Sequence, residues 1–146
     1  MTSIYNNFKE LLFNGGIDLD TDTIEVALVS DSPAYTPDID GEAFVDDVLD
    51  GGVTASELSG TGYSRKTVTI TVAQDNTNDR ATADTTDLTY TGLDAGTIDA
   101  ILVFKTVTND SDSPLIAHLT STDFPLTTNG GDVTIQWDPA GVLTLS

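Results

Sequence analysis

The sequence predicts a mainly β protein, an antiparallel β-sandwich or barrel-like fold of about seven or eight short strands with two short helices. Three observations lead to this prediction. Threonine, which is β-branched and suits pleated surfaces, occurs 24 times. Short runs of alternating apolar and polar residues recur, and clusters of Gly, Asn and Asp separate them. The length of 146 residues suits one domain, residues 1–146, with a core of its own.

Two short helices are expected in the first fifty residues. Apolar residues at helical spacing predict the first over residues 3–14, namely Ile4, Tyr5, Phe8, Leu11 and Leu12. Ser3 is its expected N-cap and Asn14-Gly15-Gly16 its end. The apolar stripe is interpreted as core, with an arm docking on a neighbouring subunit as the alternative. The second helix, near 40–50, follows Asp38 or Asp40 as N-cap and carries Phe44, Val45, Val48 and Leu49 before Gly51-Gly52.

The strands are expected in eight segments: 23–30, 66–73, 81–83, 88–90, 98–105, 115–120, 132–138 and 142–145. Residues 98–105 are the most apolar, which predicts a central strand. Residues 23–30 are apolar on both faces, so cover on both sides is expected. Residues 66–73 alternate strictly and predict one wet face. Asp138 to Gly141 has the chemistry of a type I turn, so 132–138 and 142–145 are expected to form a hairpin.

The remaining segments are expected to be connections. Residues 32–38 contain Pro33 and Pro37 and predict a loop, while 59–62 and 75–79 predict turns. No apolar run is long enough to span a bilayer, and the N-terminus lacks the basic and apolar regions of a signal peptide. The absence of cysteine excludes disulfides and thiolate metal sites.

The charge balance restricts the partners. Twenty Asp and four Glu oppose five Lys and Arg, which gives a formal net charge of −19. Such a chain repels nucleic-acid phosphates and anionic membranes, so neither is expected as a partner. Salt shortens the Debye length from about 8 Å at physiological strength to about 3 Å at 1 M. The composition therefore favours a halophilic source, with an ordinary soluble acidic protein as the alternative.

Catalytic patterns are weak, and the chain is predicted not to be an enzyme. His118 is the only histidine and is expected on the face of its strand opposite Leu115, Ala117 and Leu119, beside Ile116. It lacks a second His or a Cys for zinc, and no G-x-S-x-G motif is present. With 24 acidic side chains, any fold brings some carboxylates close together, so pairs suited to glycoside hydrolysis carry little information. No catalytic or cofactor-binding residue is assigned.

One candidate metal site is present near the start of the chain. Asp18, Asp20 and Asp22 alternate like the first ligands of a calcium loop. An EF-hand needs Gly at position 6 and Glu at position 12, and Thr23 and Val29 stand there instead. A plain turn with capping carboxylates is favoured. No cofactor is expected, and Ca²⁺ or another cation at these three residues is kept as a weak alternative.

Two segments of the chain are the most specific: NNFK…NGGIDLDTDTIEVALV, within residues 6–29, and TIQWDPAGVLTLS, residues 134–146. With the segments between them, from Ile4 to the C-terminus, they resemble a family of small structural proteins of tailed viruses of bacteria and archaea. The chain departs from the family pattern between Leu49 and Leu58 and around Arg65 and Lys66. With the charge, it looks like a protein of a haloarchaeal tailed virus.

The resemblance implies a non-enzymatic virion component that is assembled in the host cytoplasm. The favoured position is a capsid decoration or turret-like protein that binds the major capsid protein as a homo-oligomer. The alternative is a tail or baseplate component, or a receptor-binding module for host surface glycans. Glycan platforms use exposed aromatic residues, and few are expected here: Tyr35, Tyr63 and Tyr90 lie in or near turns, and Trp137 is in a core-like register.

Overall fold

The computed structural model describes residues 2–30 and 34–146 and is mainly β, as the sequence predicts. Its helical elements are α1 (Asn6–Asn14), α2 (Val45–Val48) and the 3-10 turn η1 (Asp110–Asp112). Its strands are β1 (Thr2–Ile4), β2 (Ile24–Ser30), β3 (Ser56–Glu57), β4 (Lys66–Val68), β5 (Thr71–Asp75), β6 (Arg80–Asp84), β7 (Leu88–Tyr90), β8 (Thr97–Lys105), β9 (Leu115–Leu119), β10 (Leu126–Thr127), β11 (Val133–Ile135) and β12 (Leu143–Leu145). Part of the predicted loop 32–38 lies outside the described residues.

A central antiparallel sheet organises the molecule. Its strand order is β1-β9-β8-β2-β3, with β10 added to β8 and β4 added to β2. The long strand β8 lies in the middle, which confirms the prediction of a central strand at 98–105. Among the described residues no helix is long and apolar enough to cross a membrane.

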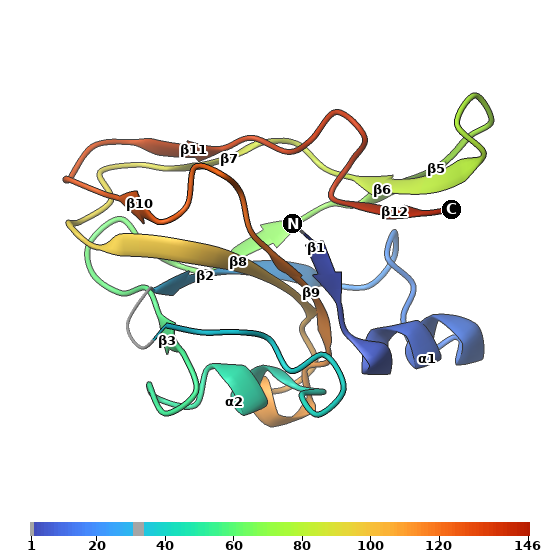
Figure 1. Cartoon of the computed structure of the whole chain (residues 1–146), viewed down its shortest axis with the longest axis horizontal. Helices are drawn as coiled ribbons and strands as arrows, with labels where there is room; N and C mark the ends of the chain where they lie inside the picture. Colours follow the sequence, from blue (N-terminus) through green and yellow to red (C-terminus); the bar gives the residue numbers. More distant parts are fainter. Residues whose placement is uncertain (1, 31–33) are drawn as a thin grey trace.

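A second β layer covers one face of this sheet. It consists of the pair β11-β7 and the three-stranded sheet β12-β6-β5. Figure 1 shows this layer above the central sheet and α2 on the opposite side. The described strands form open sheets in a sandwich, without the closure of a barrel.

Apolar residues fill the spaces on both faces of the central sheet. Strand β2 sends Ile24, Val26 and Leu28 toward the β layer, and Ala27 and Val29 toward α2. The two-sided cover expected for this strand is therefore confirmed. The core beneath the β layer also contains Ile98, Val103, Tyr90 and Ile135, and the core beneath α2 contains Leu102, Phe104, Val45 and Val48.

Both predicted helices exist but are shorter than expected. Helix α1 begins at Asn6, because Ser3 pairs with His118 in a strand and is not an N-cap. Its predicted end is confirmed, with Gly15 at φ 74° as a left-handed cap. Helix α2 is a single turn preceded by Phe44, and neither Asp38 nor Asp40 caps it. Asp47 instead accepts the N–H groups of Ala43 and Phe44, at 2.8 and 2.9 Å.

The described residues form twelve strands where seven or eight were expected, partly because one predicted strand is divided between two sheets. Segment 66–73 is divided between β4, which pairs with β2, and β5, which pairs with β6. Val68 and Ile70 turn into the core, whereas Val72 is 49% exposed, so the expectation of a single strand with one wet face is wrong.

The predicted C-terminal hairpin is also wrong. The turn is present, with Gly141 N–H bonded to Asp138 O at 2.7 Å and Gly141 at φ 99°. However, β11 pairs with β7 and β12 pairs with β6. The turn therefore joins two strands that belong to different sheets and do not pair with each other. The partner residues lie 43 to 47 positions earlier in the chain for β11 and 60 to 64 positions earlier for β12, and no local pattern could specify that choice.

Candidate functional site

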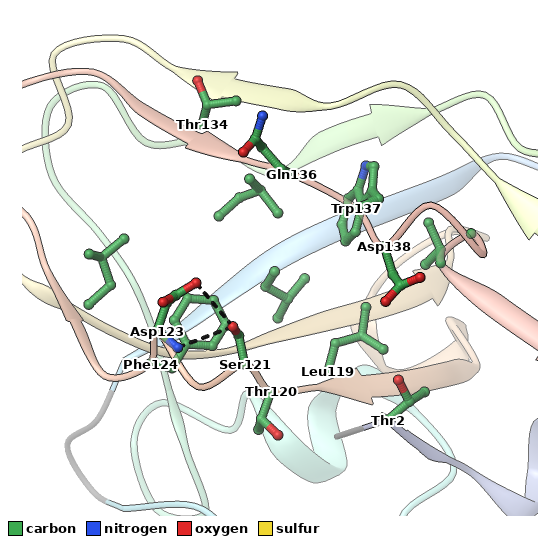
Figure 2. Close-up of a pocket in the computed structure, with 15 residues that line it drawn as sticks. Thr2, Leu119, Thr120, Ser121, Asp123, Phe124, Thr134, Gln136, Trp137 and Asp138 are labelled. Atoms are coloured by element: carbon green, nitrogen blue, oxygen red, sulfur yellow. Dashed lines mark hydrogen bonds between the residues drawn. The ribbon is translucent and has the colours of Figure 1, made fainter.

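An open groove between the two β layers is the candidate ligand site. It has a volume of about 740 Å³, which lies in the range of small-molecule sites. One wall is the end of β9 and the connection to β10, and the other is β11 and the turn before β12 (Figure 2). Its apolar lining includes Ile101, Leu119, Ile135 and Val142, which are each less than 10% exposed.

Two half-buried aromatic side chains line the groove from opposite walls. Phe124 belongs to the β9–β10 connection, and Trp137 lies two residues after the end of β11 (Figure 2). The indole of Trp137 is fixed, because its Nε1–H donates to Thr86 O at 3.0 Å and its backbone N–H donates to Asp87 Oδ1 at 3.2 Å. The core register expected for Trp137 is therefore only partly right, because part of this side chain stays exposed.

The polar rim of the groove carries acceptors and neutral donors. Asp123, Gln136 and Asp138 are exposed on it, together with Ser121 and Thr134 (Figure 2). Asp138 Oδ1 accepts the N–H of Ala140 at 2.8 Å, and Asp123 N–H donates to Ser121 Oγ at 3.1 Å. The bond from Ala140 orients the Asp138 carboxylate, and the Asp123 carboxylate accepts the Ser121 hydroxyl at 3.4 Å on the opposite wall.

All five cationic side chains lie outside the groove and have partners elsewhere. Arg65, Arg80 and Lys105 form ion pairs, Lys66 lies over the ring of Tyr90, and Lys9 donates to Asn6. The charged side chains that line the groove are therefore Asp123 and Asp138, and two carboxylates disfavour anionic ligands.

A buried polar cluster lies on the other face of the central sheet. Tyr35 donates its hydroxyl proton to Glu42, and its oxygen lies 2.9 Å from the hydroxyl oxygen of Tyr5. Glu42 also accepts the N–H of Asp38 at 3.0 Å. Burial raises the pKa of the Glu42 carboxyl, while the bonds from Tyr35 and Asp38 oppose that shift. The cluster fastens the connection before α2 to the sheet.

His118 belongs to this cluster and not to the groove. A register shift pairs Val103 with Ala117 and Phe104 with Leu115, which leaves Ile116 as a bulge. The bulge interrupts the alternation, so Ile116 packs under the β layer while His118 meets the ring of Tyr35, at 5.2 Å between centroids. The predicted place beside Ile116 is wrong.

His118 is 4% exposed, and its Nε2 has no hydrogen-bond partner among the described residues. Burial lowers the pKa of this imidazole to about 4, so the side chain is neutral at ordinary pH. A packing role fits this environment. Sequence reasoning missed the cluster of Tyr5, Tyr35 and Glu42, because none of these residues stands in a pattern that marks a site.

The Asp candidates for a metal site form a turn. Asp22 Oδ2 accepts the N–H of Asp18 at 2.8 Å and pairs with Lys105 Nζ, also at 2.8 Å. Asp20 is exposed, and its contact with Asp18 raises the pKa of its carboxyl. Within residues 2–30 and 34–146 no group of three or more His, Asp or Glu side chains is arranged to hold a metal ion.

Arg65 forms a second polar arrangement that sequence reasoning left unassigned. Its guanidinium binds Glu57 at 2.8 and 2.9 Å and Asp110 at 2.6 and 2.8 Å, and lies 5.2 Å from the ring centre of Phe104. Glu57 accepts a further bond from Tyr63, whose hydroxyl in turn accepts the N–H of Leu28 at 3.1 Å. These contacts join β3 to η1 and indicate a structural role.

Exposed apolar side chains lie on α1 and beside it. Phe13 is 94% exposed, and beside α1 lies an apolar cleft of about 200 Å³ between the helix and strands β5, β6 and β12. Leu12, Leu19, Val72 and Leu145 are among the residues that line this cleft. We call Phe13 and these four residues the α1 patch. Exposed apolar area of this kind marks interaction surfaces.

Comparisons of the chain with protein-family models, curated proteins and solved structures find no match.

Proposed function

We propose that the protein is a non-enzymatic structural component of a tailed-virus particle, a capsid decoration or turret-like subunit that binds the major capsid protein as a homo-oligomer. The proposal rests on the family resemblance in the sequence and on the α1 patch, which is the observation that carries it. The net charge of −19 keeps the chain soluble in spite of exposed apolar area. We interpret the almost fully exposed Phe13, beside the other residues of the α1 patch, as part of a surface that binds another protein.

Self-association through the α1 patch is supported by its shape. Phe13 lies on α1, the helix that borders the cleft, and is not one of the residues that line it. An isologous dimer would seat each Phe13 against the partner's cleft. Charge repulsion between two acidic copies opposes this contact and is screened by salt. We therefore expect association in molar salt and weaker association in dilute buffer.

Two measurements test these two parts of the proposal. Light scattering should give an oligomer in molar salt for the wild type and for Val53→Ser, since Val53 is 83% exposed outside the α1 patch. Phe13→Ser should be a monomer under the same conditions. Quantitative mass spectrometry of purified virions should find hundreds of copies per particle, and absence of the chain from particles would contradict the assignment.

A halophilic origin is part of the same proposal. Because 24 acidic side chains repel one another in the folded chain, the melting temperature should rise steeply from low to molar salt. Monomeric Phe13→Ser should show the same rise, which separates screening within the chain from oligomerisation. A melting temperature that does not change with salt concentration would contradict the halophilic origin and favour an ordinary acidic protein.

A tail or baseplate position with binding of host glycans is the second candidate. The groove that contains Phe124 and Trp137 favours it, because the chain offers aromatic rings there beside hydroxyl-binding side chains. A handful of copies per particle would support this position over capsid decoration.

A further inference from the structure

The groove between the β layers has the chemistry of a carbohydrate site. Trp137 and Phe124 offer ring carbons, since the one polar atom of the indole is already bonded to Thr86. Neither ring forms a close aromatic pair within the part of the chain that the structure describes. Each ring can therefore pack against the apolar C–H face of a sugar, in the way that aromatic side chains pack against apolar groups with their polar edges elsewhere.

The rim supplies partners for sugar hydroxyls. Asp123 and Asp138 are exposed acceptors on opposite walls, and the Gln136 amide both donates and accepts. A hydroxyl group of a ligand can donate a hydrogen bond to either carboxylate. Such a bond is stronger than one between two neutral groups, because the acceptor is charged.

The charge of the groove selects among sugars. All five lysine and arginine side chains are engaged elsewhere, so uronic acids, sulfated sugars and phosphates meet two carboxylates with no lysine or arginine to bind them. A quaternary ammonium ligand needs ring faces gathered around one point, whereas Figure 2 shows Phe124 and Trp137 on separate walls. Uncharged ligands rich in hydroxyls fit best, and their contacts persist in molar salt because they do not depend on ion pairs.

A peptide added as a β-strand fits less well. Strand β11 pairs only with β7 in the described chain, so its other edge borders the groove. However, β11 spans three residues and is followed by Pro139 and by the turn closed at Gly141. Short edge strands that end in a proline and a tight turn are poor templates for strand addition.

We propose that this groove binds a neutral oligosaccharide, with Trp137 and Phe124 packing against sugar rings and Asp123, Gln136 and Asp138 bonding to hydroxyls. Capsid decoration requires no such ligand, so the site goes beyond the favoured function and supplies the ligand class for the second candidate. The groove shares no residue with the α1 patch. Oligosaccharide binding can therefore be measured in a variant that no longer forms oligomers.

The single tryptophan makes the test direct, because Trp137 alone reports the groove by fluorescence. The wild type in molar salt is titrated with maltohexaose, cellohexaose and mannohexaose, and separately with hexagalacturonate, choline and a neutral extended peptide. At least one neutral hexasaccharide should change the emission saturably, and the other three probes should not. Silence with all three neutral hexasaccharides, or a response to an alternative probe alone, would overturn the proposal.

Variants locate the binding. Phe124→Ala should weaken binding about tenfold, the loss expected when one aromatic packing contact is removed, and Gln136→Ala several-fold. Trp137→Ala, followed by calorimetry, should also weaken binding about tenfold. Val107→Ser is the matched control, since Val107 is 52% exposed and does not line the groove. Unchanged affinity in folded Phe124→Ala and Gln136→Ala proteins would place the sugar elsewhere and overturn the proposal.

Discussion

The two faces of the central sheet are built from the same strands but treat polar groups differently. On the α2 face, the hydroxyls of Tyr5 and Tyr35 and the carboxyl of Glu42 bond to one another in a closed cluster beside His118. On the other face, the β layer leaves a groove whose carboxylates and amide stand in solvent. Polar groups on the closed face therefore contribute to stability, whereas those on the open side are available to a ligand.

The largest expected effect that tests this comparison is the pH response of His118. The pKa of the imidazole is 6.5 in the unfolded chain, and burial lowers this pKa to about 4 in the folded protein. Stability is therefore full above pH 6.5 and is lost as the pH falls toward 4, by about 3 kcal/mol for this one group.

His118→Leu should remove that loss. The free energy of unfolding of both proteins is measured in urea at neutral pH and at pH 4. The wild type should lose about 3 kcal/mol more than the variant between these two pH values. Acidic groups that titrate in both proteins cancel in this difference. Parallel stability curves would mean that His118 is accessible to solvent and that the α2 face is not closed.

A smaller loss is expected for Tyr35→Phe, which removes one hydroxyl from the closed cluster. Tyr5 and Glu42 would each lose a partner inside the protein, which should lower the free energy of unfolding by about 2 kcal/mol.

Thr134→Val is the matched deletion on the open side, because it removes an exposed hydroxyl that meets Thr89 at 2.9 Å. We expect it to change stability by less than about 0.5 kcal/mol. Denaturant midpoints measure both variants, and equal losses would contradict the contrast between the two faces.

Gly141→Ala tests how the turn before β12 fixes the wall of the groove that β11 and this turn form. Gly141 has φ 99°, and an added Cβ would lie 2.8 Å from Ala83 O. The substitution should destabilise the protein by about 1–2 kcal/mol.

Gly92→Ala is the glycine control, since Gly92 also has a positive φ, 61°, but has open space around its Cβ position. It should cost less than Gly141→Ala in thermal unfolding. A reversed order would mean that the turn at Gly141 relaxes freely and does not fix the wall.

The smallest expected effect on stability belongs to Gln136→Ala, on the open side. Its side chain is exposed, so the free energy of unfolding should change by less than about 0.5 kcal/mol. Thermal unfolding measures this value beside the several-fold loss of oligosaccharide affinity. Marked destabilisation would show that Gln136 supports the fold and is not free for a ligand.

Sequence patterns predicted the elements well where the signal is local. Threonine-rich alternation gave the mainly β class, the long apolar run at 98–105 gave the central strand, and Gly15 gave the end of α1. The positions of the turns at 59–62, 75–79 and 138–141 were also correct. Each depends on a few neighbouring residues whose conformational preferences agree with the final fold.

The candidate site was not predictable in the same way. The prediction placed Trp137 in a core-like register and Tyr35, Tyr63 and Tyr90 in or near turns. It did not show that Tyr35 and Tyr90 are buried there or that Trp137 also borders a groove. The groove exists because the 120–125 connection and the segment after β11 lie opposite each other across two layers, and no periodicity in either segment records that proximity.

By itself, then, the sequence determined the β class, the positions of the central strand and α1, and the acidic character of the chain, because these follow from local preference and composition. Only the tertiary structure decided which strands pair and which face His118 takes. A single bulged residue at Ile116 reverses the alternation after it, and the partners of β11 and β12 lie far back in the chain. Strand pairing is a contact between distant segments, so its choice depends on packing of the whole molecule.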